Sequence, residues 1–227
     1  MTKAILFDAS TLISFSMNGI LYILEELKKN FKDGHFIITK EVKYEVIDRP
    51  LKVKRFKLEA LKINDLLKKG ILEMPSALGI EDQEITTKTQ KILDIANSMY
   101  QGNRGDIHIL DLGEVSCLEL SKMLDNKNIP NVVATDERTT RVLSEKPENL
   151  KQILQKKLHT KINYDKSKFQ YFKKIKIIRS TELAYVAYKK GLTKLKGKPA
   201  LDALLFALKF KGCSITHEEI EQIEKLG

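Results

Sequence analysis

The sequence predicts an α/β fold built around a parallel sheet. Short apolar runs without polar interruption alternate with longer amphipathic segments along the 227 residues. Uninterrupted apolar strands are typical of a parallel sheet that helices cover on both faces, whereas half-exposed strands alternate apolar and polar residues. No linker rich in Gly, Pro or Ser divides the chain. We therefore expect one compact domain with insertions.

Five short apolar segments are predicted to be the strands. The first, KAILF, is of buried-strand type, and VVAT has the same character further along the chain. The predicted strands span residues 3–7, 35–39, 71–74, 131–135 and 174–178.

Segments of helical periodicity separate these strands, and their ends carry helix start and stop residues. The sequence DAST begins a helical pattern that runs through residue 27, Pro50 ends the next helix, the loop QGNRGD closes a long one, and Gly191 ends another. The remaining predicted helices span residues 41–48, 53–69, 81–100, 113–124, 137–144, 182–190, 199–211 and 216–226. Residues 146–172 form a basic, interrupted segment.

Positive charge is concentrated in two segments. Residues 151–180 carry +9 and residues 189–198 carry +5, so the rest of the chain is net −4 within a total of +10. A basic surface beside an acidic remainder suits a polyanionic partner, most simply nucleic acid. A solvated lysine-rich surface is the alternative.

Several kinds of protein are disfavoured by the sequence. No apolar run reaches membrane-spanning length, and the N-terminus lacks an export signal, so we expect no membrane partner and a cytoplasmic location. Cys117 and Cys213 lie in apolar helical contexts and are expected to be reduced, structural thiols. The histidines do not have zinc-ligand spacing with either cysteine.

Acidic residues follow the predicted strands and begin the predicted helices. Asp8 and Asp136 each come directly after a strand, Glu114 lies in a first helical turn, and Glu45 lies on the helix after the second strand. Ligands of a parallel α/β sheet bind beyond the carboxyl ends of the strands, so these acids could share one site. Each also has a structural explanation: aspartate is a favoured N-cap, and Asp111 with Glu114 has capping-box spacing.

Four segments, in this order, resemble the PIN domain, a nuclease fold. They are DAST, VKYEV, DLGEVSCLEL and VVATDERTTR, and the likeness continues through KIIRSTELAYVAYKKGL. The chain is similar to the archaeal and bacterial branch that has a Gly-Glu helix start and an Asp-Asp strand end. Glu137 stands where that pattern often has a second aspartate. The likeness covers roughly residues 3–144 and 174–192.

The resemblance implies a three-layer α/β/α fold with a parallel sheet of order 3-2-1-4-5 and a binding edge between the first and fourth strands. The chain is then expected to divide into a PIN-like nuclease domain, residues 1–192, and a C-terminal helical extension, residues 193–227, packed on it. Residues 145–173 are read as a basic insertion in that domain.

The resemblance also implies a metal centre. Clustered carboxylates repel one another and a phosphate unless a cation lies between them, and Mg²⁺ or Mn²⁺ prefers such oxygen ligands. We expect Asp8 and Asp136 as principal ligands and Glu114 as the third. Glu45 would hold a second ion or orient a water, and Glu137 is a further metal candidate.

Other polar residues near these acids are expected to assist them. Ser10 and Thr135 could hydrogen-bond the attacking water or a ligand carboxylate. Arg138 and Arg141 could face phosphate or solvent. Asp202, early in an appended helix, is expected to interact with the helix dipole.

The basic insertion is a candidate nucleic-acid surface. Aromatic residues interleave with its lysines and could stack on unpaired bases, although anchoring to the core is the favoured reading; they are Tyr164, Phe169, Tyr171 and Phe172. The candidate contact residues are Lys151, Lys156, Lys157, Lys173, Lys174 and Arg138.

The expected function is that of a metal-dependent endoribonuclease acting in RNA processing. The alternatives are a catalytically weak PIN-like RNA-binding module and the toxin nuclease of a toxin–antitoxin pair. A phosphatase that forms a phospho-aspartate would need an acid where Ser10 stands. The resemblance also implies a homodimer and leaves an inhibitory protein partner open.

Overall fold

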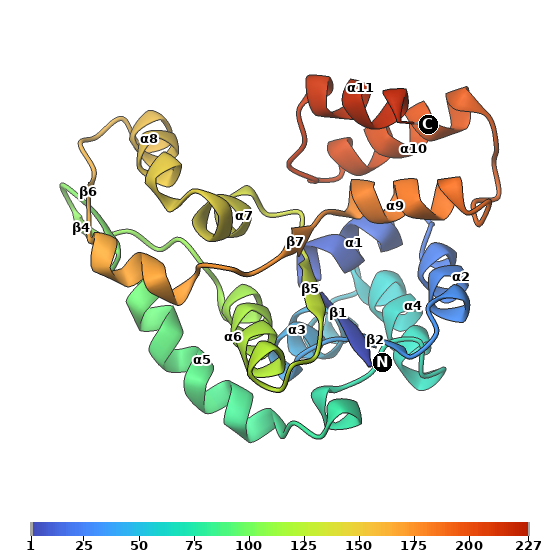
Figure 1. Cartoon of the computed structure of the whole chain (residues 1–227), viewed down its shortest axis with the longest axis horizontal. Coiled ribbons are helices and arrows are strands. Elements are labelled where there is room, and N and C mark those ends of the chain that lie inside the picture. Colours follow the sequence, from blue (N-terminus) through green and yellow to red (C-terminus); the bar gives the residue numbers. More distant parts are fainter. Residues whose placement is uncertain (1, 227) are drawn as a thin grey trace.

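A parallel four-stranded sheet organises the computed structural model, which describes residues 2–226 (Figure 1). Its strands, in spatial order, are β2 (Gly34–Ile37), β1 (Lys3–Phe7), β5 (Asn131–Ala134) and β7 (Ile177–Ile178). Ile5 pairs with Phe36 on one side and with Val132 on the other. The fold is therefore mixed α/β with a parallel sheet, as predicted.

The strand order differs from the predicted 3-2-1-4-5 because the expected strand at residues 71–74 does not form. This segment contributes a single bridge, in which Glu73 donates to Phe36 O at 2.8 Å and accepts from Ile38 N at 3.0 Å. The amides of residues 71 and 72 instead donate to Leu66 O and close the preceding helix. Pro75, which has no amide hydrogen, then starts a 3₁₀ turn, η3 (Pro75–Leu78). Only Glu73 remains free to pair between the end of α4 and Pro75, and one residue is too few for a strand.

A second, antiparallel sheet lies outside the parallel one. It consists of β4 (Gly105–Asp106), β3 (Tyr100–Gly102) and β6 (Asn163–Tyr164). The segment QGNRGD, predicted to be a loop, thus forms a hairpin, whose turn uses the positive φ of 103° at Gly105. β6 belongs to the basic insertion, so pairing with β3 attaches that insertion to the domain.

The helices largely follow the predicted segments, except that a helix at Pro147–Leu158 lies in the basic segment 146–172, where none was predicted. They are α1 (Ala9–Met17), α2 (Tyr22–Asn30), α3 (Lys40–Lys43), α4 (Lys57–Lys68), α5 (Asp82–Asn97), α6 (Leu112–Asn126), α7 (Arg138–Glu145), α8 (Pro147–Leu158), α9 (Ser180–Lys189), α10 (Lys198–Phe210) and α11 (His217–Lys225), with the short turns η1 (Tyr44–Asp48), η2 (Pro50–Lys52) and η4 (Lys166–Tyr171). The helical pattern predicted through residue 27 is broken at Gly19, whose φ is 66°. The helix predicted at 41–48 changes to π-helical geometry at Tyr44.

Helices lie on both sides of the parallel sheet, an arrangement compatible with three layers. In Figure 1, α3, α5 and α6 lie to one side of the strands, and α1, α2, α4 and α9 lie to the other. α6 contacts β1 and β5, while α2 contacts β2 and α9. Phe7 and Phe36 meet edge to face across β1 and β2, with ring centroids 5.2 Å apart. This ring contact belongs to the buried core around β1 and β2.

The aromatic residues of the basic insertion pack against the domain, which confirms the favoured reading. Phe172 is fully buried, and Phe169 is 3% exposed. The ring of Phe169 stacks on Tyr164 at 5.5 Å, and both rings lie near Tyr100. These side chains anchor the insertion and are not free to stack on bases.

The C-terminal helices contact the domain through α9 and α1. α10 packs against both α9 and α11. Asn18, at the end of α1, donates from Nδ2 to Ala207 O on α10 at 3.3 Å. Within residues 2–226, no helix combines the length and apolar character needed to cross a bilayer.

We expect Phe172→Ala to lower the free energy of unfolding by about 3 kcal/mol, because it removes a fully buried ring and leaves a cavity. Urea denaturation measures this value. Phe210→Ala is the control: this ring is 79% exposed, so its removal should change the free energy of unfolding by less than about 0.5 kcal/mol. Equal effects of the two substitutions would show that the insertion is not anchored as described.

Candidate active site

A cavity of about 250 Å³ opens where β1 and β5 end, and acidic side chains dominate its lining. The acids are Asp8, Glu45, Asp111, Glu114 and Glu137. They come from the end of β1, from η1, from the start of α6 and from the start of α7, as expected for a ligand site beyond the carboxyl ends of parallel strands. The cavity therefore gathers most of the acids that the sequence singled out.

Asp8 is the most buried of these acids, at 2% exposure. Its Oδ2 accepts hydrogen bonds from Ser10 Oγ at 2.6 Å and from Thr135 Oγ1 at 2.9 Å. The two hydroxyl groups thus orient a carboxylate, one of the two tasks expected of them. Asp8 precedes α1 but makes no capping hydrogen bond with its side chain, so capping does not account for this acid.

Glu114 combines a capping role with a place in the cavity. Its Oε2 accepts from Asp111 N at 2.8 Å, as in a capping box. Its Oε1 accepts from the hydroxyl of Thr140 on α7. Both oxygens are therefore held, and Glu114 links the starts of α6 and α7.

Glu45 projects from the π-helical turn η1, in which Arg49 N donates to Tyr44 O at 2.9 Å. π-helical turns are rare and occur frequently at functional sites. A Cβ added at Gly113 would meet Glu45 Oε2 at 2.8 Å, which is closer than such contacts normally are. Glycine at the start of α6 therefore leaves room for this carboxylate.

Asp136, expected to be a principal ligand, does not line the cavity, whereas its neighbour Glu137 does. Asp136 is 1% exposed, and its Oδ1 accepts from Ser180 N at the start of α9 at 2.8 Å. Successive side chains of an extended backbone point in opposite directions. Thr135 and Glu137 therefore face Asp8, and Asp136 faces α9.

Burial and mutual repulsion raise the pKa values of Glu45, Glu114 and Glu137. Burial is the largest cause for Glu114, and the charge of Asp8 adds to it, so the pKa of Glu114 rises to about 8. Burial and the charges of Asp8, Asp111 and Glu137 raise the pKa of Glu45 to about 7. Burial, and then the charges of Asp8, Asp136 and Asp111, raise the pKa of Glu137. Burial alone raises the pKa of Asp8, and its hydrogen bonds with Ser10 and Thr135 lower it in part. No cationic side chain of the described residues holds these pKa values at their ordinary levels, so Glu114 binds a proton near pH 7 in the metal-free protein.

These residues fit a hard divalent cation in type. Carboxylate oxygens are the ligands that Mg²⁺ and Mn²⁺ prefer, and a cation would relieve the repulsion that raises the pKa values. Within residues 2–226, no three Asp, Glu, His or Cys side chains are already gathered closely enough to hold a metal ion. The side chains of Glu45 and Glu137 are partly exposed, and within residues 2–226 their carboxylates accept no hydrogen bond, so they can rotate, whereas Asp8 is fixed by its hydrogen bonds.

The predicted nucleic-acid contact residues occupy different places. Lys157, on α8, is exposed and lowers the pKa of Glu137 by its charge, so the insertion approaches the cavity. Lys151 instead lies over the ring of Tyr164, with Nζ 5.2 Å from its centroid. The exposed residues Lys156, Lys173 and Lys174 do not line the cavity, and Arg138 lines a separate pocket.

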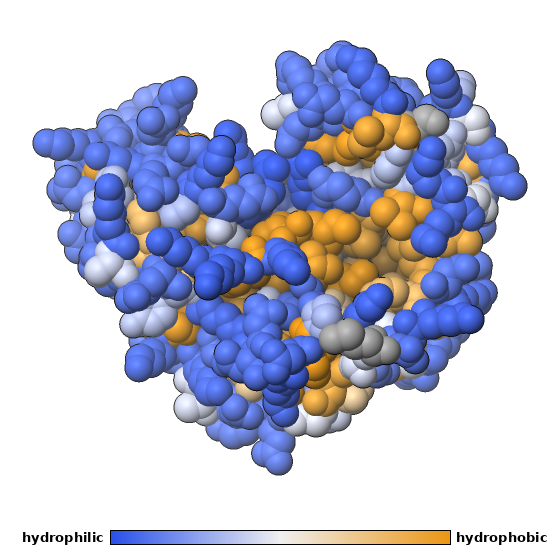
Figure 2. All heavy atoms as spheres, in the orientation of Figure 1, coloured by the Kyte–Doolittle hydropathy of each residue, from blue (hydrophilic) through white to orange (hydrophobic). Residues whose placement is uncertain are grey.

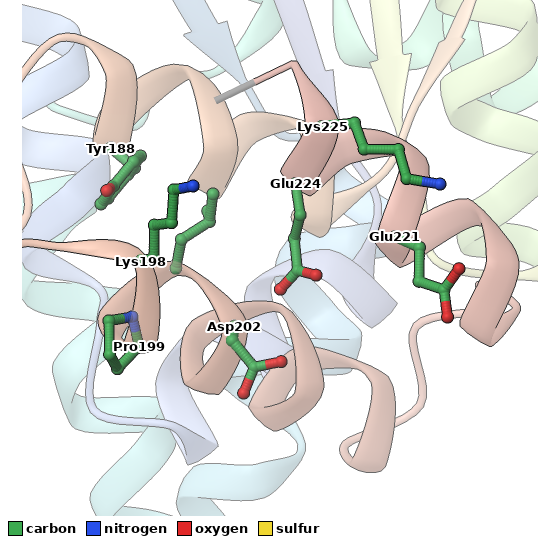
Figure 3. A pocket seen from close by; sticks show the side chains of 8 residues that line it. Tyr188, Lys198, Pro199, Asp202, Glu221, Glu224 and Lys225 are labelled. Carbon is green, nitrogen blue, oxygen red and sulfur yellow. The ribbon is translucent and has the colours of Figure 1, made fainter.

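Asp202 also lies outside the acidic cavity. It lines a pocket of about 650 Å³ between α9, α10 and α11, together with Glu221 and Glu224 (Figure 3). The pKa of Glu224 is raised, by burial first and then by the charge of Asp202. This second group of acids is partly offset by Lys198 and Lys225 at the rim of the pocket.

Comparison with known proteins finds no matching family model, no matching curated protein and no matching solved structure. The resemblance to the PIN domain therefore rests on the four sequence motifs.

Two residues of the site carry roles that the sequence did not assign. Asp111 was read only as a capping residue, yet it lines the cavity. Thr140 was not selected, yet it donates to Glu114. The D-x-x-E spacing gave a signal for the first. Nothing in the sequence gives one for the second, because the contact joins two helices that are distant in sequence.

We expect the metal-free protein to lose stability as the pH rises. The pKa of Glu114 is higher in the folded chain, at about 8, than the ordinary value of 4.5, so the folded state binds more protons between these values and stability falls through that window. In chelator, Glu114→Gln should flatten the pH dependence of the free energy of unfolding by on the order of 1 kcal/mol. Glu84→Gln, an exposed control on α5, should not. If the free energy of unfolding depends on pH in the same way for the wild type and both variants, the repulsion at Glu114 is contradicted.

We expect Gly113→Ala to weaken the site without weakening the fold. The added Cβ displaces the carboxylate of Glu45, the free end of a flexible side chain, while alanine favours the helix. The melting temperature should stay the same or rise, and the apparent Mn²⁺ affinity, measured by titration, should fall by about tenfold. Leu112→Ala, in the same turn and 45% exposed, is the matched control. A lower melting temperature with unchanged Mn²⁺ affinity would refute this role of the glycine.

Proposed function

We propose that the chain is a metal-dependent endoribonuclease with a three-layer, PIN-like α/β/α fold. The observation that carries the proposal is the convergence of five carboxylates in one cavity of a chain whose net charge is +10. A basic protein that binds a polyanion has no other evident use for an uncompensated acidic cavity. The choice of RNA rests on the resemblance alone, so DNA belongs in every test.

Asp8, Glu114 and Glu137 would hold the first divalent ion, and Glu45 would hold a second ion or orient a water. Mg²⁺ or Mn²⁺ bound there supplies an activated water and neutralises charge on a phosphodiester. Asp136, expected from the sequence as a ligand, is replaced in this proposal by Glu137. Its carboxylate instead binds the first amide of α9.

The other residues of the site fix the carboxylates before substrate arrives. Ser10 and Thr135 hold Asp8, and Thr140 holds Glu114. Fixed hydrogen bonds reduce the reorganisation needed when a substrate binds. Lys157, close enough to affect the charge of Glu137, attracts the phosphates of the strand.

Cleavage of RNA and DNA oligonucleotides in Mn²⁺ tests the proposal. We expect Asp8→Asn and Glu137→Gln to lower the rate at least about 100-fold, because each removes a carboxylate that faces the cavity. Asp136→Asn is the matched control. It keeps an oxygen for Ser180 N, so its rate should stay within about tenfold of wild type.

The pattern of the three variants separates the outcomes. Cleavage that persists in chelator, or that survives in both Asp8→Asn and Glu137→Gln, would reject the metal site. Oligonucleotide binding without Mn²⁺-dependent cleavage by the wild type would support the RNA-binding module instead. A toxin role, a homodimer, an inhibitory protein partner and a cytoplasmic location stay predictions.

A further inference from the structure

A pocket of about 330 Å³ lies between the start of α7 and the segment that joins α10 to α11. Three cations line it, Arg138, Arg141 and Lys209, together with Cys213, Ser214, Ile215 and Thr216. Within the described residues 2–226, no acid is among the lining residues. Figure 2 shows a notch with hydrophilic walls between the lobe of α7 and α8 and the lobe of α10 and α11. The pocket is thus a basic recess separate from the acidic cavity.

The guanidinium group of Arg141 is held by two contacts, but one of its N–H groups has no hydrogen-bond acceptor among residues 2–226. Its Nη1 lies 3.3 Å from Glu219 Oε1, and its Nη2 donates to Ser214 O at 3.4 Å. Its Nε is buried and has no hydrogen-bond partner in the described chain. Buried donors are nearly always paired, so this N–H calls for an acceptor that the chain does not supply. A phosphate oxygen is such an acceptor, and arginine commonly binds phosphate with two N–H groups.

The nearest acid does not cancel the positive charge of the pocket. Glu219 is shared between Arg141 and Arg179, whose Nη1 lies 2.9 Å from the same Oε1. The other oxygen of Glu219 accepts from Thr216 N at 2.8 Å. Arg179 also donates from Nε to Glu182 Oε1 at 2.8 Å, so the two guanidinium groups face two carboxylates. The net positive charge of the pocket therefore comes from Lys209 and the exposed Arg138, which line it. The pocket therefore attracts anions.

Cys213 lines the pocket without adding a reactive group. Burial first, and then the charge of Asp136, raise the pKa of Cys213 to about 12, so the thiol is neutral near pH 7. Asp136 is buried and accepts from Ser180 N.

We propose that this pocket binds one phosphate group of the nucleic-acid strand whose scissile bond lies in the acidic cavity. The proposal rests on the proposed function for the identity of the strand. α7 connects the two places: Glu137 lines the cavity and the next residue, Arg138, lines the pocket. A strand that crosses the first turn of α7 contacts both. The pocket fixes the position of the strand and does not read its sequence, because phosphates carry no sequence information.

Binding without cleavage isolates the pocket from the metal site. The affinity of single-stranded RNA and DNA oligonucleotides of about 12 nucleotides is measured in chelator across a series of salt concentrations. The double variant Arg138→Gln/Lys209→Gln leaves Arg141 and its contacts intact. We expect about tenfold weaker binding and a slope of log affinity against log salt that is shallower by about 0.7 for each lost phosphate contact. The control is Lys62→Gln/Arg104→Gln, which removes the same charge from α4 and the β3–β4 turn.

The outcomes separate this inference from the nuclease proposal. Equal affinity and salt slope for the two double variants, or no binding of either oligonucleotide by the wild type, would overturn the inference. If the pocket variants bind weakly while Mn²⁺-dependent cleavage is absent in every protein, the pocket stands and the nuclease proposal fails. Inorganic phosphate is the final arm. In one outcome, phosphate raises the melting temperature of the wild type while the pocket variant and the control variant bind oligonucleotides equally well. In that case the pocket binds a free anion, and its assignment to the nucleic-acid strand is wrong.

Discussion

Mutual repulsion among carboxylates is the constraint on which the rest of the site depends. Parallel pairing sets Phe7 beside Ala134, so the residues that follow β1 and β5 emerge at one edge of the sheet. Asp8 leaves that edge buried, and acids from η1, α6 and the start of α7 point into the same cavity. Such an arrangement opposes folding, because four of the carboxylates are partly or fully desolvated and lie near others of the same sign. Hydroxyl groups and one amide donate hydrogen bonds to Asp8 and Glu114, which orients these carboxylates without neutralising them.

The polypeptide around the acidic cavity carries positive charge. The insertion is anchored by buried aromatic rings, so its lysines are carried on a fixed lobe rather than on a free arm. One of them, Lys157, already acts on Glu137 by its charge. The C-terminal helices form a second basic wall through Lys209. The acidic cavity therefore lies between two places that carry cationic side chains. Lys157 belongs to the basic segment 151–180, whereas Lys209 lies outside both basic segments of the sequence.

The sequence was sufficient where a local pattern decides the outcome. Asp8, Glu45 and Glu114 could be selected because each follows a strand or begins a helix, and all three line the cavity. It was insufficient where distant segments decide. Asp136 and Glu137 are adjacent acids after the same strand, and the sequence does not distinguish which of them faces the cavity. The hydrogen bond from the amide of Ser180, 44 residues later, shows that Asp136 faces away from it. The strand expected at 71–74 does not form because its first two amides close α4. The strands of the hairpin at QGNRGD are only two and three residues long, and the third strand of their sheet, β6, comes from the distant insertion.

Anomalous diffraction from a crystal soaked in Mn²⁺ tests the central claim most directly. A strong peak is expected in the cavity, within ligand distance of Asp8, Glu114 and Glu137, with Asp136 still bound to α9. The contradictory result is a cavity without a peak at Mn²⁺ concentrations that saturate other sites, or a peak only among Asp202, Glu221 and Glu224. Either result would mean that the converging acids do not form a metal centre, and the proposed metal-dependent cleavage would be ruled out.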